Sequence, residues 1–525
     1  MSESSIAVLV PRAHVKQVKL ALEDRGVLDR TVKIAAERKP NLHSTSEASI
    51  PRMLVPTTLL GLNSSSFFKE KLLSDIGLAH LSEDISIVTH VLDLNGSSSC
   101  RRNPLLRALS KALRELSEPL LASIDLSCEL LVSAFPESYS VYKPLLLLPP
   151  NTFESSPWEK LLLSHATGSP VLQRIWPIVA GAVGATHVAV NAGIPLQTAP
   201  SESHQTISEA ATEAGENILR RPVDLTPIYG DFGPSPTLER ISNPTTADIS
   251  SAFWVSHTQN GIHQVWAPLY TMFSRGNIRE KTRMLTLPSV LNSITEGKDN
   301  GTAGSPHQNP PEPGCTAVDL YAGIGYFAFS YKKAGVSKVL CWELNPWSIE
   351  GLRRGAQRNG WTSQIFTNMP REVEEWDLLK KNIQDVDFLV FQESNEKAMA
   401  AISQFAWGTD APPIRHVNCG FLPSSRNSWK TAIRAMDVHL GGWIHAHENV
   451  GATELETRKG DVESEMQAHL DLWDAERGSD GIYRRRVGVE HVEKVKTYAP
   501  GVLHVVFDVW VDGSKDVENV LERNR

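Results

Sequence analysis

The chain has 525 residues, which is too long for one ordinary domain, so we expect two or three folded units of roughly 150 residues each. Hydrophobic residues make up 41% and charged residues 21%, a composition that excludes a wholly disordered, fibrous or collagen-like chain. The net charge of −8 does not indicate a nucleic-acid partner by itself, although it can hide a local basic face.

The sequence predicts neither a membrane span nor a secretory signal. Its longest apolar runs, at residues 145–148 and 178–183, fall short of the roughly 20 residues that cross a bilayer. Residues 1–5 lack a basic segment followed by an apolar one. The five cysteines are scattered, which argues against a disulfide framework and against a CxxC zinc site. We therefore expect a cytoplasmic protein.

The N-terminal region, residues 1–150, begins as a small α/β unit. Residues 6–10 form an apolar run typical of a strand, and residues 15–28 have helical spacing. Residues 105–116 predict an amphipathic helix with basic residues on its polar side. That polar side is either a solvated helix face or an RNA contact.

The middle of the chain, residues 151–270, is expected to be a second α/β domain with an insertion. Residues 198–251 are rich in Ser, Thr, Pro and Glu and predict a loop or a disordered insertion. A flexible linker is expected at residues 297–314, because Gly and Pro recur there too often for a helix or a central strand.

After this linker, strands and helices alternate regularly. Apolar runs typical of strands recur at residues 316–321, 338–342, 388–391, 416–422 and 442–447, with helical patterns in most of the gaps. This alternation predicts a mostly parallel sheet with helices on both faces and a ligand at the carboxyl ends of its strands. Two further apolar runs, at residues 493–498 and 503–511, are joined by only four residues, 499–502, which favours an antiparallel hairpin.

The strongest local signal is a strand that ends in a glycine turn, Val-Asp-Leu-Tyr-Ala-Gly-Ile-Gly-Tyr-Phe, at residues 318–327. Gly323 and Gly325 allow unusual backbone dihedrals and a close approach of the backbone to a ligand. Glu343 ends the next predicted strand, 24 positions after Asp319, where a carboxylate can accept both hydroxyls of a ribose. A nucleotide or S-adenosylmethionine site fits this pattern.

The motif Glu-Leu-Asn-Pro at 343–346, following Asp-Leu-Tyr-Ala-Gly-Ile-Gly, resembles the class I methyltransferase-like enzymes that modify position 37 of tRNA. That group comprises guanine N1-methyltransferases and wybutosine-synthesising aminocarboxypropyltransferases, and both use S-adenosylmethionine. The resemblance implies a Rossmann-like α/β fold, with a mostly parallel seven-stranded sheet and a C-terminal antiparallel hairpin. The S-adenosylmethionine-binding domain would span residues 271–525.

Two further segments favour the aminocarboxypropyl branch, whereas residues 271–283 resemble a motif common to both branches. Residues 418–425, Asn-Cys-Gly-Phe-Leu-Pro-Ser-Ser, are similar to that branch, and methylating relatives carry Asn-Leu-Pro or Asn-Pro-Pro there. Residues 495–502 look like its terminal segment. The resemblance covers about residues 251–510 and leaves 41–170 largely unexplained.

The resemblance implies a set of site residues. The residues that it places around S-adenosylmethionine are Ser274 and Lys281 at the methionine end, Asp319, Gly323 and Gly325 in the glycine turn, Glu343 on the ribose, and Ser394 and Asn395 at the adenine. Glu393 is the alternative to Ser394 as the acceptor for the adenine amino group. The residues implied for the RNA substrate are Arg283, Asn418, Pro423 and Ser424. No residue is assigned as a general base, and no metal is expected.

The implied reaction transfers the 3-amino-3-carboxypropyl group of S-adenosylmethionine to C7 of 4-demethylwyosine at position 37 of tRNA(Phe), and it releases 5′-methylthioadenosine. The alternatives are methylation of N1 of guanine 37 and a non-catalytic RNA-binding protein of the same fold. The implied partner is the tRNA(Phe) anticodon loop, with residues 1–150 as a possible tRNA-contacting module and a monomer slightly favoured.

RNA contacts would come from aromatic side chains and a basic rim. The candidate stacking residues are Tyr326, Phe421 and Trp429. The candidate rim residues are Arg353, Arg354, Arg358, Arg426, Lys430, Arg484, Arg485 and Arg486.

Structural roles compete with several of these assignments. Ser274 and Asn277 would otherwise cap a helix, and Lys281 and Arg283 would be a solvated pair. His445 and His447 alternate along a strand and share a face, but no third ligand is evident beside them.

Overall fold

The computed structural model divides the chain into two compact units, Met1–Arg107 and Ala108–Arg525, with the boundary inside helix α4 (Pro104–Arg114). The residues that the structure describes are 4–29, 34–36, 52–60, 66–75, 77–91, 103–116, 118–191, 225–299, 314–368, 376, 383, 385–405, 411–478 and 484–514.

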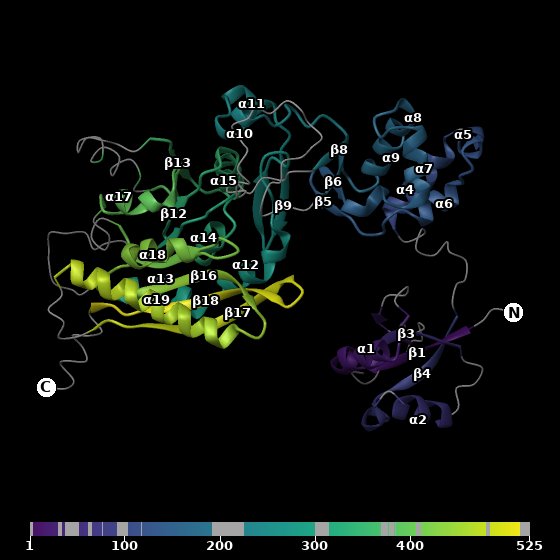
Figure 1. Cartoon of the computed structure of the whole chain (residues 1–525), viewed down its shortest axis with the longest axis horizontal. Helices are drawn as coiled ribbons and strands as arrows, with labels where there is room; N and C mark the ends of the chain where they lie inside the picture. The colour runs from purple at the N-terminus through teal and green to yellow at the C-terminus, as the bar shows by residue number, and fades with distance from the viewer. Residues whose placement is uncertain are drawn as a thin grey trace, which may run out of the picture. The chain divides into compact units, whose positions relative to one another are not determined.

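The first unit is an antiparallel sheet with two helices (Figure 1). Its elements are β1 (Ser4–Pro11), η1 (Arg12–His14), α1 (Val15–Asp24), β2 (Ala35–Ala36), β3 (Arg52–Leu60), α2 (Ser66–Asp75), η2 (Ala79–Leu81) and β4 (Ser86–Val91). The strand order is β2-β3-β1-β4. The strand predicted at 6–10 is confirmed. The helix predicted over 15–28 ends at Asp24, because Gly26 turns the chain with a φ of +67°.

Helix α4 confirms the amphipathic pattern predicted at 105–116. Its leucines, among them Leu105, Leu109 and Leu113, are buried. On its polar side Lys111 pairs with Glu115 over 4.0 Å, and both side chains are mostly exposed. The polar face of α4 is therefore exposed, as both a solvated face and an RNA contact require.

A second sheet, in the order β5-β6-β7-β8, follows α4 within the larger unit. The elements of this region are α5 (Glu118–Ser123), α6 (Cys128–Ser133), β5 (Ser140–Tyr142), β6 (Leu145–Leu148), η3 (Pro150–Phe153), α7 (Ser156–Ser164), α8 (Pro170–Gln173), α9 (Trp176–Gly181), β7 (His187–Val190) and β8 (Thr226–Tyr229). Because β6 pairs in parallel with β7, the domain boundary expected at residue 150 falls inside this sheet.

The insertion expected at 198–251 is folded in its last part. Residues 198–224 lie outside the described residues, but β8, α10 (Leu238–Ser242) and α11 (Thr246–Ser251) follow. Thr245 and Asp248 form a reciprocal capping box at the start of α11, so polar residues typical of loops here build a helix end. Of the linker expected at 297–314, the first three residues continue helix α13 (Pro288–Asp299), and residues 300–313 lie outside the described residues.

The rest of the larger unit is built on an eight-stranded sheet in the order β13-β14-β12-β11-β15-β16-β18-β17. Its strands are β11 (Thr316–Asp319), β12 (Lys338–Trp342), β13 (Ser363–Phe366), β14 (Phe388–Phe391), β15 (Ile414–Cys419), β16 (Gly442–Gly451), β17 (Val487–Ala499) and β18 (Val502–Val511). The first six in this order are parallel, and β18 runs antiparallel to β16 and to β17, so the parallel sheet and the terminal hairpin are confirmed. The expected count of seven strands is short by β13, an edge strand.

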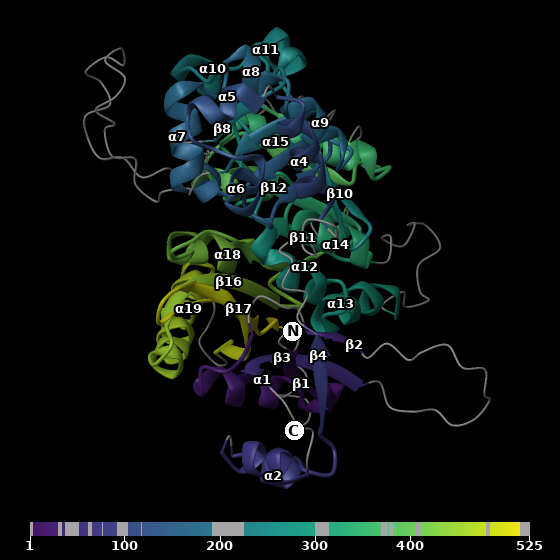
Figure 2. The ribbon, with the colours of Figure 1, turned by 90° about the vertical axis from the view of Figure 1, so that its right-hand side faces the viewer.

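Helices cover both faces of this sheet (Figure 2). The remaining elements are the hairpin β9 (Val255–Gln259) and β10 (Ile262–Trp266), η5 (Arg275–Asn277), α12 (Ile278–Met284), α14 (Ala328–Ala334), α15 (Pro346–Arg358), η6 (Asn395–Lys397), α17 (Ala398–Ile402), η7 (Arg426–Ser428), α18 (Trp429–Ala435) and α19 (Leu455–Glu476). One apolar core joins α17, α18 and α19 to the sheet, and the other joins α12, α13, α14 and α15 to its opposite face. The carboxyl ends of β11, β12 and β15 are therefore flanked by two packed layers. Among the helices described, none has both the length and the apolar character that crossing a membrane requires.

Candidate functional site

The glycine turn joins β11 to α14 at the centre of the sheet. Gly323 and Gly325 have φ values of +55° and +88°, which side-chain-bearing residues rarely adopt. A Cβ at Gly323 would lie 2.7 Å from the Tyr326 ring, and one at Gly325 would lie 2.7 Å from the Phe329 ring. The two glycines are thus required by the turn and by the aromatic rings behind it, a reason that the sequence did not show.

Glu343 holds this turn from the neighbouring strand. Its Oε2 accepts a hydrogen bond from the Gly323 N–H at 2.8 Å, and its Oε1 accepts one from the Asn345 N–H at 2.7 Å. Burial raises the pKa of Glu343, although these backbone donors oppose the shift. Each carboxylate oxygen has a second lone pair, so Glu343 can still accept hydroxyl donors from a ligand.

Asp319 and Asn418 lie side by side at the carboxyl ends of β11 and β15. Asn418 Nδ2 donates to Asp319 Oδ1 at 3.0 Å. The other two oxygens, Asp319 Oδ2 and Asn418 Oδ1, are buried and have no hydrogen-bond partner of normal length among the described residues. Burial, opposed by the bond from Asn418, raises the pKa of Asp319 to about 6. Two buried acceptors without donors are a site for a ligand that carries N–H or O–H groups.

Ser274 and Lys281 reach the glycine turn through Tyr326. The Ser274 N–H donates to the Tyr326 hydroxyl at 3.4 Å, and the Lys281 ammonium lies 5.5 Å from the centre of the Tyr326 ring. Ser274 and Asn277 occupy the N-cap positions of η5 and α12, as the capping alternative expects, but neither side chain makes a capping hydrogen bond.

The Lys281 ammonium is held by the protein itself. It donates to Gln259 Oε1 at 2.7 Å, to Gln264 Oε1 at 3.2 Å and to the Ser274 carbonyl at 3.5 Å. These three acceptors use all three of its protons. Lys281 is only 3% exposed, and burial together with the charge of Lys496 lowers its pKa to about 7. Lys281 is neither solvated nor free to grip a ligand.

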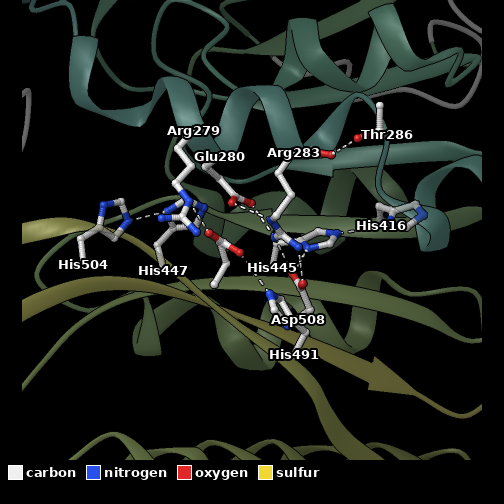
Figure 3. Close-up of polar contacts among 11 residues, drawn as sticks. Arg279, Glu280, Arg283, Thr286, His416, His445, His447, His491, His504 and Asp508 are labelled. Atoms are coloured by element: carbon white, nitrogen blue, oxygen red, sulfur yellow. Dashed lines mark hydrogen bonds and ion pairs between the residues drawn. The ribbon is translucent and has the colours of Figure 1, made fainter. Parts of the chain in front are cut away.

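Arg283 belongs to a buried ionic network beneath α12 (Figure 3). Its guanidinium donates to both carboxylate oxygens of Glu280, at 2.7 and 2.8 Å, and to Asp508 Oδ1 at 2.9 Å. His445 Nδ1 donates to the same Asp508 oxygen at 2.7 Å, and His445 Nε2 lies 3.3 Å from His416 Nδ1. Burial alone would raise the pKa of Asp508, but His445 and Arg283 lower it. The structure therefore gives Arg283 an internal partner on each side, instead of the solvated or substrate-facing position expected.

The residues expected at the adenine have mixed roles. Asn395 Nδ2 donates to the Leu320 carbonyl at 2.8 Å and so fixes the end of β11. The Ser394 hydroxyl accepts a 3.3 Å bond from the Glu396 N–H as the cap of η6. Glu393 accepts a long 3.4 Å bond from the Trp342 indole, so its carboxylate also lies at this position. Both alternatives for the adenine acceptor remain at the carboxyl end of β14.

The loop after β15 is fixed by Glu448, a residue that the sequence did not single out. Glu448 Oε1 accepts bonds of 2.8 Å from the Ser424 hydroxyl and from the Ser425 N–H. Glu448 Oε2 accepts a bond from Arg458 at 3.1 Å. The peptide before Pro423 is cis. Ser424 is therefore a positioning element of the loop, with its proton already donated.

The three candidate stacking residues differ in access. Trp429 is fully buried, and its indole donates to the Ser425 hydroxyl at 3.0 Å. The Tyr326 hydroxyl donates to the Met272 carbonyl. Phe421 stacks on Tyr321 with ring centres 4.9 Å apart, and both are only partly buried. Tyr326 and Phe421 are both partly buried, whereas Trp429 has no exposed surface.

Most of the expected basic rim is neutralised within the protein. Arg353 and Arg354 both pair with Glu350 at 2.7 Å. The other members of the rim that pair with acids are Arg426 with Glu465, Arg484 with Asp471 and Arg485 with Asp474. Within the described part of the chain, no three His, Cys, Asp or Glu side chains gather as metal ligands.

Comparison of the sequence with curated proteins finds relatives that share most of its length. The tRNA wybutosine-synthesizing protein 2 of Schizosaccharomyces pombe is 36% identical over 374 residues, which cover 71% of this chain and 72% of that protein. The Saccharomyces cerevisiae protein of the same name is 34% identical over 58% of this chain and 59% of its own length. A Pyrococcus horikoshii TYW2 crystal structure in complex with MeSAdo has a TM-score of 0.42 and 19% identity, over 77% of this chain and 98% of that one. No family model matches the chain.

Proposed function

The chain belongs to the tRNA wybutosine-synthesizing protein 2 family, and we propose that it transfers the 3-amino-3-carboxypropyl group of S-adenosylmethionine to C7 of 4-demethylwyosine at position 37 of tRNA(Phe). In coarser terms it is an S-adenosylmethionine-dependent, tRNA-modifying transferase of wybutosine synthesis. In the proposed reaction the bond between sulfur and the amino acid Cγ breaks, a carbon–carbon bond forms at C7, C7 loses its proton, and 5′-methylthioadenosine leaves.

The observation that carries the proposal is the set of buried acceptors at the carboxyl ends of three neighbouring strands. Asp319 Oδ2 and Asn418 Oδ1 have no hydrogen-bond partner of normal length among the described residues, although the Ala328 N–H approaches the Asp319 carboxylate, and Glu343 retains lone pairs beside the glycine turn. S-adenosylmethionine carries an α-ammonium group and two ribose hydroxyls, which are the donors that such acceptors need. We assign the ammonium group to Asp319 and Asn418 and the ribose to Glu343.

The protein contributes placement. S-adenosylmethionine supplies a sulfonium that activates three carbons, and the product depends on which carbon faces the acceptor. The loop at 418–425 borders the site, and Glu448 fixes its shape through Ser424 and Ser425. Its Gly-Phe-Leu-Pro-Ser-Ser sequence supports the aminocarboxypropyl reaction over methylation of guanine N1. Phe421, which belongs to this loop and stacks on Tyr321, is the residue that we propose stacks against the substrate base.

The partner that we propose is the anticodon loop of tRNA(Phe), met by a monomer in the cytoplasm. The first unit, Met1–Arg107, is proposed as a tRNA-contacting module. Because five of the eight expected rim arginines and lysines are paired with acids, we expect only a modest dependence of tRNA affinity on salt.

One labelling experiment tests the reaction. The protein is incubated with tRNA(Phe) carrying 4-demethylwyosine and with S-adenosylmethionine labelled in its carboxyl carbon. Label in the RNA is the expected result, since only transfer of the amino acid portion carries that carbon across. In a parallel reaction the S-adenosylmethionine is labelled in its methyl group instead. Label that reaches the RNA only in this parallel reaction would show a methyltransferase. If S-adenosylmethionine does not bind at all in a titration, the chain is a non-catalytic RNA-binding protein.

A further inference from the structure

Lys496 is a cation beside the loop that carries Ser274, and no described residue pairs with it. It lies on β17, half-buried, and makes no hydrogen bond or ion pair with any described residue of the chain. Burial lowers its pKa, and no nearby carboxylate counteracts that shift. The sequence motif at 495–502 contains Lys496, but nothing in the sequence gave it a role.

The Lys496 side chain lies directly over Gly276, in the loop that also carries Ser274. A Cβ at Gly276 would be 2.8 Å from Lys496 Nζ and 3.0 Å from its Cδ. The backbone of Gly276 does not have the positive φ that would itself demand glycine. A side chain at Gly276 would therefore meet the end of the flexible Lys496 chain and displace its ammonium group.

Two lysines thus lie beside the loop that carries Ser274 and Gly276. Lys281 is close enough for the charge of Lys496 to lower its pKa, but its protons are all donated to Gln259, Gln264 and Ser274. Lys496 has its protons free. Its register partner on β18 is His504. Burial and the charge of Lys496 lower the pKa of His504 to about 4, so this neighbour is a neutral imidazole and not a counter-ion for Lys496.

We propose that Lys496, with its proximity to the Ser274 loop, binds the carboxylate of the amino acid portion of S-adenosylmethionine. This inference rests on the proposed function and moves the carboxylate contact from Lys281 to Lys496. Lys281 does not contact the ligand in this proposal. It donates a hydrogen bond to the Ser274 carbonyl and adds a second positive charge nearby.

The test compares ligands that differ in the carboxylate. S-adenosylmethionine and S-adenosylhomocysteine carry it, and 5′-methylthioadenosine lacks the whole amino acid portion. Titration calorimetry with the full chain measures all three. We expect Lys496→Met to weaken the first two by about 10- to 100-fold, the value of one charge-assisted hydrogen bond, and to leave 5′-methylthioadenosine within about 2-fold. Lys496→Arg should retain more of the affinity than Lys496→Met.

Two further variants separate this role from a general change in charge or folding. Gly276→Ala keeps every charge but fills the space of the ammonium, so it should weaken S-adenosylmethionine and spare 5′-methylthioadenosine in the same pattern. Lys494→Met removes an exposed lysine of the same strand and should change none of the three affinities.

The outcomes are distinct. Equal weakening of all three ligands by Lys496→Met would overturn the inference. A second refuting result is unchanged binding of S-adenosylmethionine together with weaker and less salt-dependent binding of tRNA, which would make Lys496 a phosphate contact. If the wild-type chain binds none of the three ligands, the proposed function fails and the inference falls with it.

Discussion

Replacing Arg283 by methionine should destabilise the larger unit without altering its ligand contacts. The guanidinium is the shared partner of Glu280, which is fully buried, and of Asp508, whose side chain is 5% exposed. Methionine fills a similar volume but leaves two buried carboxylates, one of them with only His445 as a donor. Removing one partner of a buried ion pair costs about 3–5 kcal/mol.

Thermal melting of the full chain, followed by calorimetry, measures this cost. At about 2.1 cal/mol/K per residue, a unit of about 400 residues has a melting entropy of about 0.9 kcal/mol/K, so its transition should fall by about 3–6 °C at pH 7. Arg353→Met is the matched control, because Arg353 pairs with Glu350 at the surface with a side chain 42% exposed. That pair should contribute about 0–1 kcal/mol.

The deficit should also depend on pH with a definite sign. In the wild type the pKa of Asp508 is lowered, so its contribution to stability is present above the unfolded value of about 3.9 and is lost as pH falls through the folded value. Without Arg283, burial raises the pKa of Asp508, and protonation of Asp508 relieves the variant as pH falls from 7 toward 4. The difference between variant and wild type should therefore shrink in acid. The reasoning is refuted if Arg283→Met melts within about 2 °C of Arg353→Met, or if tRNA affinity falls while stability does not.

Three further predictions concern the glycine turn and its neighbours. Glu343→Gln should weaken S-adenosylmethionine about 10- to 100-fold in calorimetry, because one amide oxygen replaces two charged acceptors, and a change below 2-fold would contradict the assignment. Gly325→Ala should cost about 2–5 kcal/mol in a melting experiment, from its φ and the Phe329 ring, whereas Gly360→Ala, with a φ of +78° and open space, should cost about 1–2; equal costs would refute the packing argument. The pKa of Asp319 is raised to about 6, so its stabilising contribution is complete below about pH 3.9 and is lost as pH rises through 6, a cost of about 3 kcal/mol. Asp319→Asn should therefore flatten the dependence of the melting temperature on pH between 4 and 7. An unchanged slope would contradict this.

The sequence predicted the parallel sheet well because its strands are short, continuous apolar runs separated by helical patterns. Lys338–Trp342 and Phe388–Phe391 are buried along their whole length, as such runs require. The strand β13 was missed because Ser363–Phe366 mixes polar and apolar residues at an exposed edge. Local periodicity carries little information about a strand that buries only one of its residues.

The sequence predicted that the candidate site residues lie where strands end, but it predicted few of their contacts. Asp319, Glu343 and Asn418 were located because motifs fix where each strand ends. The partners of Lys281 and Arg283 could not be predicted, because they come from segments that no local pattern connects. Gln259 and Gln264 belong to a hairpin before the motif, and Asp508 lies 225 positions after Arg283. Such pairings are decided by the tertiary fold.

The bond between Arg283 and Asp508 also orders events during synthesis of the chain. Arg283 leaves the ribosome long before β18, the strand that carries Asp508 and lies between β16 and β17 in the sheet. Until that strand inserts, Arg283 has only Glu280 to neutralise it, and the edge of β16 has no neighbour on that side. A nascent fragment that stops short of β18 therefore exposes an unpaired strand edge, which is a general cause of aggregation in incomplete chains.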